Sequence, residues 1–145
     1  MRINEFKLIR YGKFTDRTLH LPARASAQRA DIHLIVGPNE AGKSTLRQAI
    51  GDWLFGFPTR TPMGFVHPMP ELRLGGSLQR TGEGTANAVS LAFERTKGNK
   101  NTVRTPDDDA LPDTALAPWL ASLQREAYER MYGLDHDRLV AGGAD

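Results

Sequence analysis

Residues 37–45 read GPNEAGKST and come directly after the apolar run IHLIV. This stretch decides the fold, because its spacing fits G-x-x-x-x-G-K-[ST], a loop whose backbone N–H groups wrap a chain of phosphates. We expect the following residues to surround the phosphates: Gly37, Pro38, Asn39, Glu40, Ala41, Gly42, Lys43, Ser44 and Thr45. The flanking sequence must show whether such a loop can form here.

The flanks predict a strand before the loop and a helix after it. Residues 32–36 are apolar and rich in β-branched side chains, which is typical of a strand buried on both faces. After the loop, apolar residues recur at helical spacing, and Gly56 offers a stop. The predicted apolar stripe consists of Leu46, Ala49, Ile50, Trp53 and Leu54. A strand, a glycine loop and a helix N-terminus in this order make an anion site, because free N–H groups and the helix dipole point at the anion.

Each residue type in the loop has a chemical reason. Gly37 lets the chain leave the strand, and Gly42 lets the backbone approach a phosphate closely. Lys43 is expected to reach the β- and γ-phosphates of a nucleotide, and the Ser44 hydroxyl is expected to bind Mg²⁺. Thr45 is assigned to the α-phosphate or to a local cap. The alternative is a glycine-rich turn before an ordinary helix.

Composition places the chain in a broad class. Its 145 residues are 39% hydrophobic and 25% charged, as in one globular domain. It has no cysteine, which excludes disulfides and thiolate chemistry and fits a reducing compartment. The charged start MRINEFKLIR is no signal peptide, and no apolar run could span a membrane, so we expect a cytoplasmic location. The net charge of +2, with arginines spread along the chain, permits nucleic-acid contact without indicating it.

The rest of the chain predicts further elements around the loop. Within 1–21, residues 2–10 and 14–21 read as a strand pair joined by a turn. Four prolines in 56–71 predict an irregular excursion. Residues 72–104 alternate as an antiparallel β-arm, in which Val89, Leu91 and Phe93 are expected to face inward. Residues 113–133 are expected to form a last helix, capped by Asp113 or Thr114.

The residues expected of a complete ATPase are not all found. No apolar strand after residue 55 ends in Asp or Glu, the usual partner that completes a Mg²⁺ shell. The four histidines stand far apart, and the run at 107–109 is more simply a solvated acidic loop than a metal site. We therefore assign no catalytic residue within the chain and expect it to bind nucleotide without hydrolysing it.

Several longer stretches carry a family resemblance. GPNEAGKST is followed by LRQAIGDWLFG from residue 46, then by FGFPTRTPMGFVHPMPELRLGGSLQ, FERTKGNKNT and YERMYGLDHDRLVAGG. With the N-terminal strand pair, these resemble the SMC-like, SbcC-type ABC ATPases of DNA repair, and specifically the N-terminal end of the YhaN-like members. The resemblance covers essentially the whole chain.

The resemblance implies an α/β fold of the P-loop NTPase type, the N-terminal lobe of an ABC/SMC head. Its mixed sheet would carry the phosphate-loop strand centrally beside the antiparallel β-arm. The implied cofactors are ATP and Mg²⁺. The implied partners are the C-terminal lobe of the same protein, reached through a long coiled coil, a metal-dependent nuclease subunit, and DNA at its ends. Two such heads would sandwich two ATP molecules.

The resemblance also points to residues outside the loop. Arg10 matches a position from which related ATPases touch the nucleotide, although a surface arginine is an equal alternative. Asp135 and His136 fall where relatives keep a glutamine that senses Mg²⁺ and the γ-phosphate, or they belong to a plain loop after the helix. Two other functions stay open: a self-contained P-loop NTPase or kinase, and a nucleotide-gated module that contacts DNA or protein through basic residues of the arm.

Overall fold

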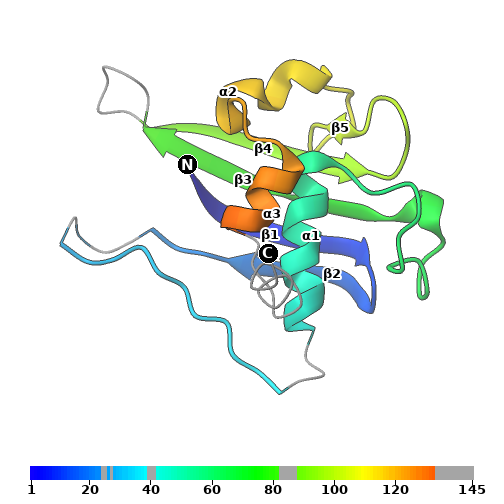
Figure 1. Ribbon diagram of the computed structural model, residues 1–145, viewed down its shortest axis with the longest axis horizontal. Coiled ribbons are helices and arrows are strands. Elements are labelled where there is room, and N and C mark those ends of the chain that lie inside the picture. The colour runs from blue at the N-terminus through cyan, green and yellow to red at the C-terminus, as the bar shows by residue number, and fades with distance from the viewer. Residues whose placement is uncertain (24–25, 27, 39–41, 82–87, 133–145) are drawn as a thin grey trace, which may run out of the picture.

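A computed structural model of the chain describes residues 1–145 except 24–25, 27, 39–41, 82–87 and 133–145 (Figure 1). Its strands are β1 (Arg2–Tyr11), β2 (Phe14–His20), β3 (Arg73–Thr81), β4 (Ala88–Thr96) and β5 (Val103–Arg104). Its helices are α1 (Lys43–Phe55), η1 (Met69–Glu71), η2 (Asp113–Leu116), α2 (Ala117–Leu120) and α3 (Arg125–Met131). The strands form one sheet in the order β2-β1-β3-β4-β5, and α1 lies across one face of it with α3 alongside (Figure 1).

Every strand pair in the described sheet is antiparallel. The predicted strand pair forms as β1 and β2, and β1 also pairs with β3. The predicted arm is therefore no separate projection, because β3 and β4 continue the same sheet. The expected mixed sheet is wrong for the described residues, which make an antiparallel sheet with a helix layer on one face.

Trp53 of α1 is the centre of the core between helix and sheet. Its ring stacks on Phe93 of β4 with 4.5 Å between centroids and lies 5.3 Å from Phe6 of β1. The indole N–H donates to the Phe93 carbonyl at 3.2 Å, so its polar atom is satisfied although the side chain is fully buried. Gly76 makes room for this ring, because a Cβ there would lie 2.4 Å from the Glu5 carbonyl and 3.0 Å from Trp53. The predicted helical stripe thus sets how α1 crosses the sheet.

The predicted strand at residues 32–36 is not formed. Ile32, Leu34 and Val36 are 79%, 85% and 77% exposed, and the segment has no regular secondary structure. A strand exists only through hydrogen bonds to a neighbouring strand. None of the strand pairs in the described part of the chain includes this segment. The β-forming composition of residues 32–36 therefore produces no strand within the described part of the chain.

The single helix expected at 113–133 is also wrong. The chain forms η2, α2 and α3 instead, and Ala121 interrupts them with a φ of 52°. That left-handed conformation ends a right-handed helix, so the apolar stripe is distributed over separate turns. Neither Asp113 nor Thr114 caps a helix, since η2 begins after Pro112 without a side-chain cap. Residue 133 lies outside the described residues.

The predicted alternation of the hairpin holds only where α1 covers it. Phe93 is fully buried and Leu91 packs partly against the core, but Val89 is 43% exposed. Val89 pairs with Arg80 near the hairpin tip, and that end of the hairpin extends past α1 (Figure 1). Alternation fixes which face a residue occupies, whereas burial also needs a second layer above it.

Candidate nucleotide-binding site

Gly42 opens α1 in a conformation that requires glycine. Its φ is 98°, in the left-handed region, and a Cβ there would lie 2.6 Å and 2.9 Å from two ring atoms of Phe14. The first helical hydrogen bond runs from the Leu46 N–H to the Gly42 carbonyl at 2.9 Å. Because Gly42 has no side chain to cap the helix, the first amides of α1 are left for a ligand.

Lys43 folds back across the loop. Its ammonium donates to the Gly37 carbonyl, which joins the first turn of α1 to the start of the loop. The side chain is half-buried, whereas Ser44 beside it is exposed. The two described ends of the loop are therefore joined through Lys43, and Ser44 is accessible to a ligand. Asn39, Glu40 and Ala41, which the motif predicts around the phosphates, lie outside the described residues.

The turn between β1 and β2 packs against this loop and adds a cation. The Lys13 Cε lies 3.1 Å from the position that a Cβ on Gly42 would take, and its Nζ is 5.5 Å from the Phe14 ring centroid. Gly12, with a φ of 55°, brings the turn against Thr45, whose Cγ2 would be 3.3 Å from a Cβ on Gly12. The sequence pattern placed Lys13 only within the turn between the first two strands. The sequence feature that could have pointed to Lys13 is a lysine in a tight turn at this position.

Two adjacent glycines show which face of the sheet each side chain occupies. A Cβ on Gly76 would meet Trp53 of α1, whereas a Cβ on Gly75 would meet Ile9 and Glu94. Successive strand residues point to opposite faces. Ile9 and Glu94 therefore lie on the face of the sheet away from α1.

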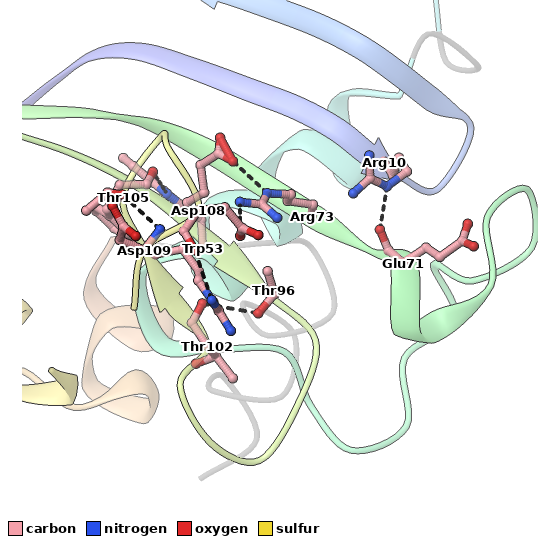
Figure 2. A network of polar contacts seen from close by, with 12 residues as sticks. Arg10, Trp53, Glu71, Arg73, Thr96, Thr102, Thr105, Asp108 and Asp109 are labelled. Atoms are coloured by element: carbon pink, nitrogen blue, oxygen red, sulfur yellow. Dashed lines mark hydrogen bonds and ion pairs between the residues drawn. The ribbon is translucent and has the colours of Figure 1, made fainter. Parts of the chain in front are cut away.

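Arg10 contributes to a pocket of about 520 Å³ that also includes Ile9 and Glu94. Its Nε donates to the Glu71 carbonyl at 2.6 Å, and the neighbouring Arg73 donates to Glu94 at 2.6 Å and to Asp108 at 2.9 Å (Figure 2). The structure thus places Arg10 among ion pairs on the outer face, and its contact with a nucleotide stays a prediction. Asp108, from the acidic run at 107–109, serves as a partner for Arg73.

Two arginines hold the C-terminal end of α1. Arg95 donates to the Trp53 carbonyl at 3.0 Å and to the Leu54 carbonyl at 2.8 Å, while Arg125 donates to the Gly56 carbonyl at 2.7 Å. These bonds satisfy carbonyls that the end of a helix leaves free, and a cation there suits the helix dipole. Burial lowers the pKa of Arg95 to about 10, so it stays charged at neutral pH. In the sequence, Arg95 is one of the basic residues of the arm that could contact DNA or a partner, whereas the structure buries it against the end of α1.

A buried carboxylate links this end of α1 to β1 and α3. Asp52 is fully buried, accepts a hydrogen bond from the Tyr11 hydroxyl at 2.6 Å, and pairs with Arg125 at 2.5 Å. Burial, and then the negative charge of Asp52, raise the pKa of Tyr11 well above its ordinary value. The site helix is therefore tied at its far end to two other elements. Asp135 and His136, which follow α3, lie outside the described residues.

Comparisons with known proteins place the chain in a family. A profile of the AAA domain family matches residues 1–145. YhaN of Bacillus subtilis strain 168, which is described as uncharacterized, is 31% identical over 137 residues. The alignment covers 93% of this chain and 13% of YhaN. No solved structure matches.

The resemblance to YhaN-like proteins that the sequence indicated is thereby confirmed. No helix in the described part of the chain is long and apolar enough to cross a membrane. The chain belongs to the AAA domain family, whose ATPase members use a nucleotide and usually Mg²⁺.

Proposed function

We propose that the chain binds Mg-ATP in the loop at 37–45, as the N-terminal part of an SMC-like ATPase head that acts on DNA ends. The observation that carries this proposal is the left-handed Gly42 packed against Phe14, with Lys43 directly after it bonded back to Gly37. A left-handed glycine at the N-terminus of a helix, where the backbone carries no Cβ, suits the close approach of a phosphate.

The residues around the loop suit a magnesium nucleotide. Lys43 would exchange the Gly37 carbonyl for phosphate oxygens, and Lys13 lies close enough to the loop to add positive charge. Ser44 is exposed and can offer its hydroxyl oxygen to Mg²⁺, a cation that prefers oxygen ligands. When bound, the metal would neutralise part of the phosphate charge.

Hydrolysis, in this proposal, needs residues outside the chain. The chain spans only 13% of YhaN, and the exposed apolar segment at 32–36 has the composition of a buried strand. We propose that strands of a C-terminal lobe pair with this segment and bring the groups that position water. The work on DNA ends, with a metal-dependent nuclease subunit as partner, is part of the same proposal and rests on the resemblance to SbcC-type proteins.

Calorimetric titration of Mg-ATP into the wild type and Lys43→Ala tests the binding step. Loss of a charge-assisted contact of about 1.5–3 kcal/mol predicts an affinity about ten- to a hundredfold lower in the variant. Lys97→Ala, in the turn between β4 and β5, is the matched control and should bind as the wild type does. Equal affinities in wild type and Lys43→Ala would refute the assignment.

Steady-state phosphate release tests the second part of the proposal. The 145-residue chain should release phosphate at the background rate, equal to that of Lys43→Ala. Turnover of about one per second that disappears in Lys43→Ala would instead favour a self-contained NTPase, since such a rate is typical of enzymes.

A further inference from the structure

Phe65 is a large apolar side chain exposed beside the phosphate loop. It belongs to the irregular segment between α1 and η1, and 66% of its surface is accessible. The segment is held against the β1–β2 pair on both sides of this residue. The Gly12 N–H donates to the Met63 carbonyl at 3.0 Å, and Thr15 Oγ1 is hydrogen-bonded to His67 Nε2 at 2.7 Å. Phe65 is therefore exposed but anchored.

Gly12 relates this aromatic ring to the loop. The position that a Cβ on Gly12 would take lies 3.3 Å from Thr45 Cγ2, 3.3 Å from Met63 Sδ and 3.8 Å from Phe65 Cζ. The last residue of the loop and the edge of the ring thus both lie beside Gly12. Met63, whose backbone carbonyl holds this segment to Gly12, packs against the hydrophobic core.

The direction of the nucleotide follows from the order of groups in the loop. In the proposed site, Lys43 and Ser44 take the β- and γ-phosphates and the metal. Of the two roles open to Thr45, we take the one at the α-phosphate end. The ribose and base are attached at that end and extend past Thr45. This is the side on which Phe65 lies.

We propose that Phe65 is the platform on which the nucleobase of ATP stacks, a contact that adds affinity for a base of any kind and that rests on the proposed nucleotide site. The surroundings of Phe65 favour a nucleobase as its occupant, because the side chain adjoins the end of the phosphate site from which a base would project. Stacking on an aromatic ring tolerates any base, since each base presents a π-face. The loop then supplies charge for the phosphates, and Phe65 supplies apolar contact for the base.

The test compares ATP with inorganic triphosphate, which lacks a base. In titrations with Mg²⁺ present, Phe65→Ala should bind ATP about tenfold more weakly and should bind triphosphate as the wild type does. Phe65→Trp keeps an aromatic face and should restore ATP affinity. The control is Val89→Ala, a substitution at an exposed apolar residue of β4, and it should change the affinity for neither ligand.

The outcomes separate this inference from the function on which it rests. Lys43→Ala should weaken both ligands, because both contain the phosphates. If Lys43→Ala weakens both ligands while Phe65→Ala binds ATP normally, the stacking contact is overturned and the nucleotide site stands. The same conclusion follows if Phe65→Ala weakens the binding of ATP and of triphosphate equally. If ATP binding is indifferent to Lys43→Ala, the proposed function and this inference both fail.

Discussion

Arg125 of α3 pairs with Asp52 of α1, with 2.5 Å between Nη2 and Oδ1, and Asp52 is fully buried. Removing one partner of a buried pair leaves an uncompensated charge. We expect Arg125→Ala to lower the free energy of unfolding by about 3 kcal/mol, near the low end for buried pairs because Arg125 is 27% exposed on its side chain. Urea unfolding measures this.

The matched control for that prediction is Arg130→Ala on the same helix. Arg130 is exposed in the last turn of α3, so its replacement should change stability by less than about 0.5 kcal/mol. If the two variants were equally stable, α3 would not be held to α1 by this pair.

Tyr11→Phe probes the same carboxylate from β1. At neutral pH the variant leaves one oxygen of Asp52 without its hydrogen bond, at a cost of about 1–3 kcal/mol. The sign of the pH effect follows from the raised pKa of Tyr11. Above about pH 10 the unfolded chain loses the proton of the Tyr11 hydroxyl, while the folded protein keeps it. The stability that this group contributes is therefore fully present below about pH 10 and decreases as the pH rises above it.

The measurement for Tyr11 is unfolding by urea at a series of alkaline pH values. The wild type should lose stability relative to Tyr11→Phe by about 1.4 kcal/mol per pH unit above pH 10. Parallel pH profiles for the two proteins would show that Tyr11 ionises as readily in the folded state as in the unfolded one.

Gly42→Ala tests the geometry of the loop. A left-handed residue with a Cβ costs about 1–2 kcal/mol, and here the Cβ would also collide with Phe14. We expect ATP affinity to fall at least tenfold, measured by calorimetry. Gly98→Ala is the control, because its Cβ would have ordinary contacts at 3.6 Å from Thr102. Unchanged ATP binding in Gly42→Ala would mean that the loop does not approach the phosphates closely.

Leu34→Asp tests whether the segment at 32–36 awaits a partner. Leu34 is 85% exposed, so the substitution should leave the thermal stability of the 145-residue chain unchanged. In a longer protein that contains the C-terminal lobe, the same change would bury an unpaired carboxylate and should abolish ATPase activity. Leu74→Asp, at a fully buried position of β3, should unfold both proteins. A longer protein whose activity tolerates Leu34→Asp would contradict the strand pairing.

The sequence was most informative where local pattern and packing agree. The spacing of Leu46, Ala49, Trp53 and Leu54 predicted α1, because a helix that covers one sheet face needs one apolar stripe. The strand pair and the hairpin followed from alternation in the same way. Residues 32–36 carry an equally clear β-pattern, but a strand also needs a neighbour in the sheet, and pattern alone cannot supply one.

The parts of the site that the sequence missed depend on tertiary contact. Lys13 and Phe65 approach the loop only because a turn and an irregular segment fold over the N-terminus of α1. Arg10, which the family resemblance links to the nucleotide, lies in the pocket on the outer face of the sheet, and its contact with a nucleotide stays a prediction. The register shift against β3 between Leu8 and Arg10 is not visible in the alternation of β1.

The most direct test of ATP binding at the loop is an amide NMR titration of the ¹⁵N-labelled chain with Mg-ATP. Binding at the loop predicts that the largest shifts fall on the amides of Gly42, Lys43, Ser44 and Thr45, and that Lys13 in the adjoining turn also shifts. In Lys43→Ala the same shifts should require about ten to a hundred times more ATP. Shifts centred on Arg73 and Glu94 on the outer face of the sheet, with the loop amides unmoved, would contradict the account.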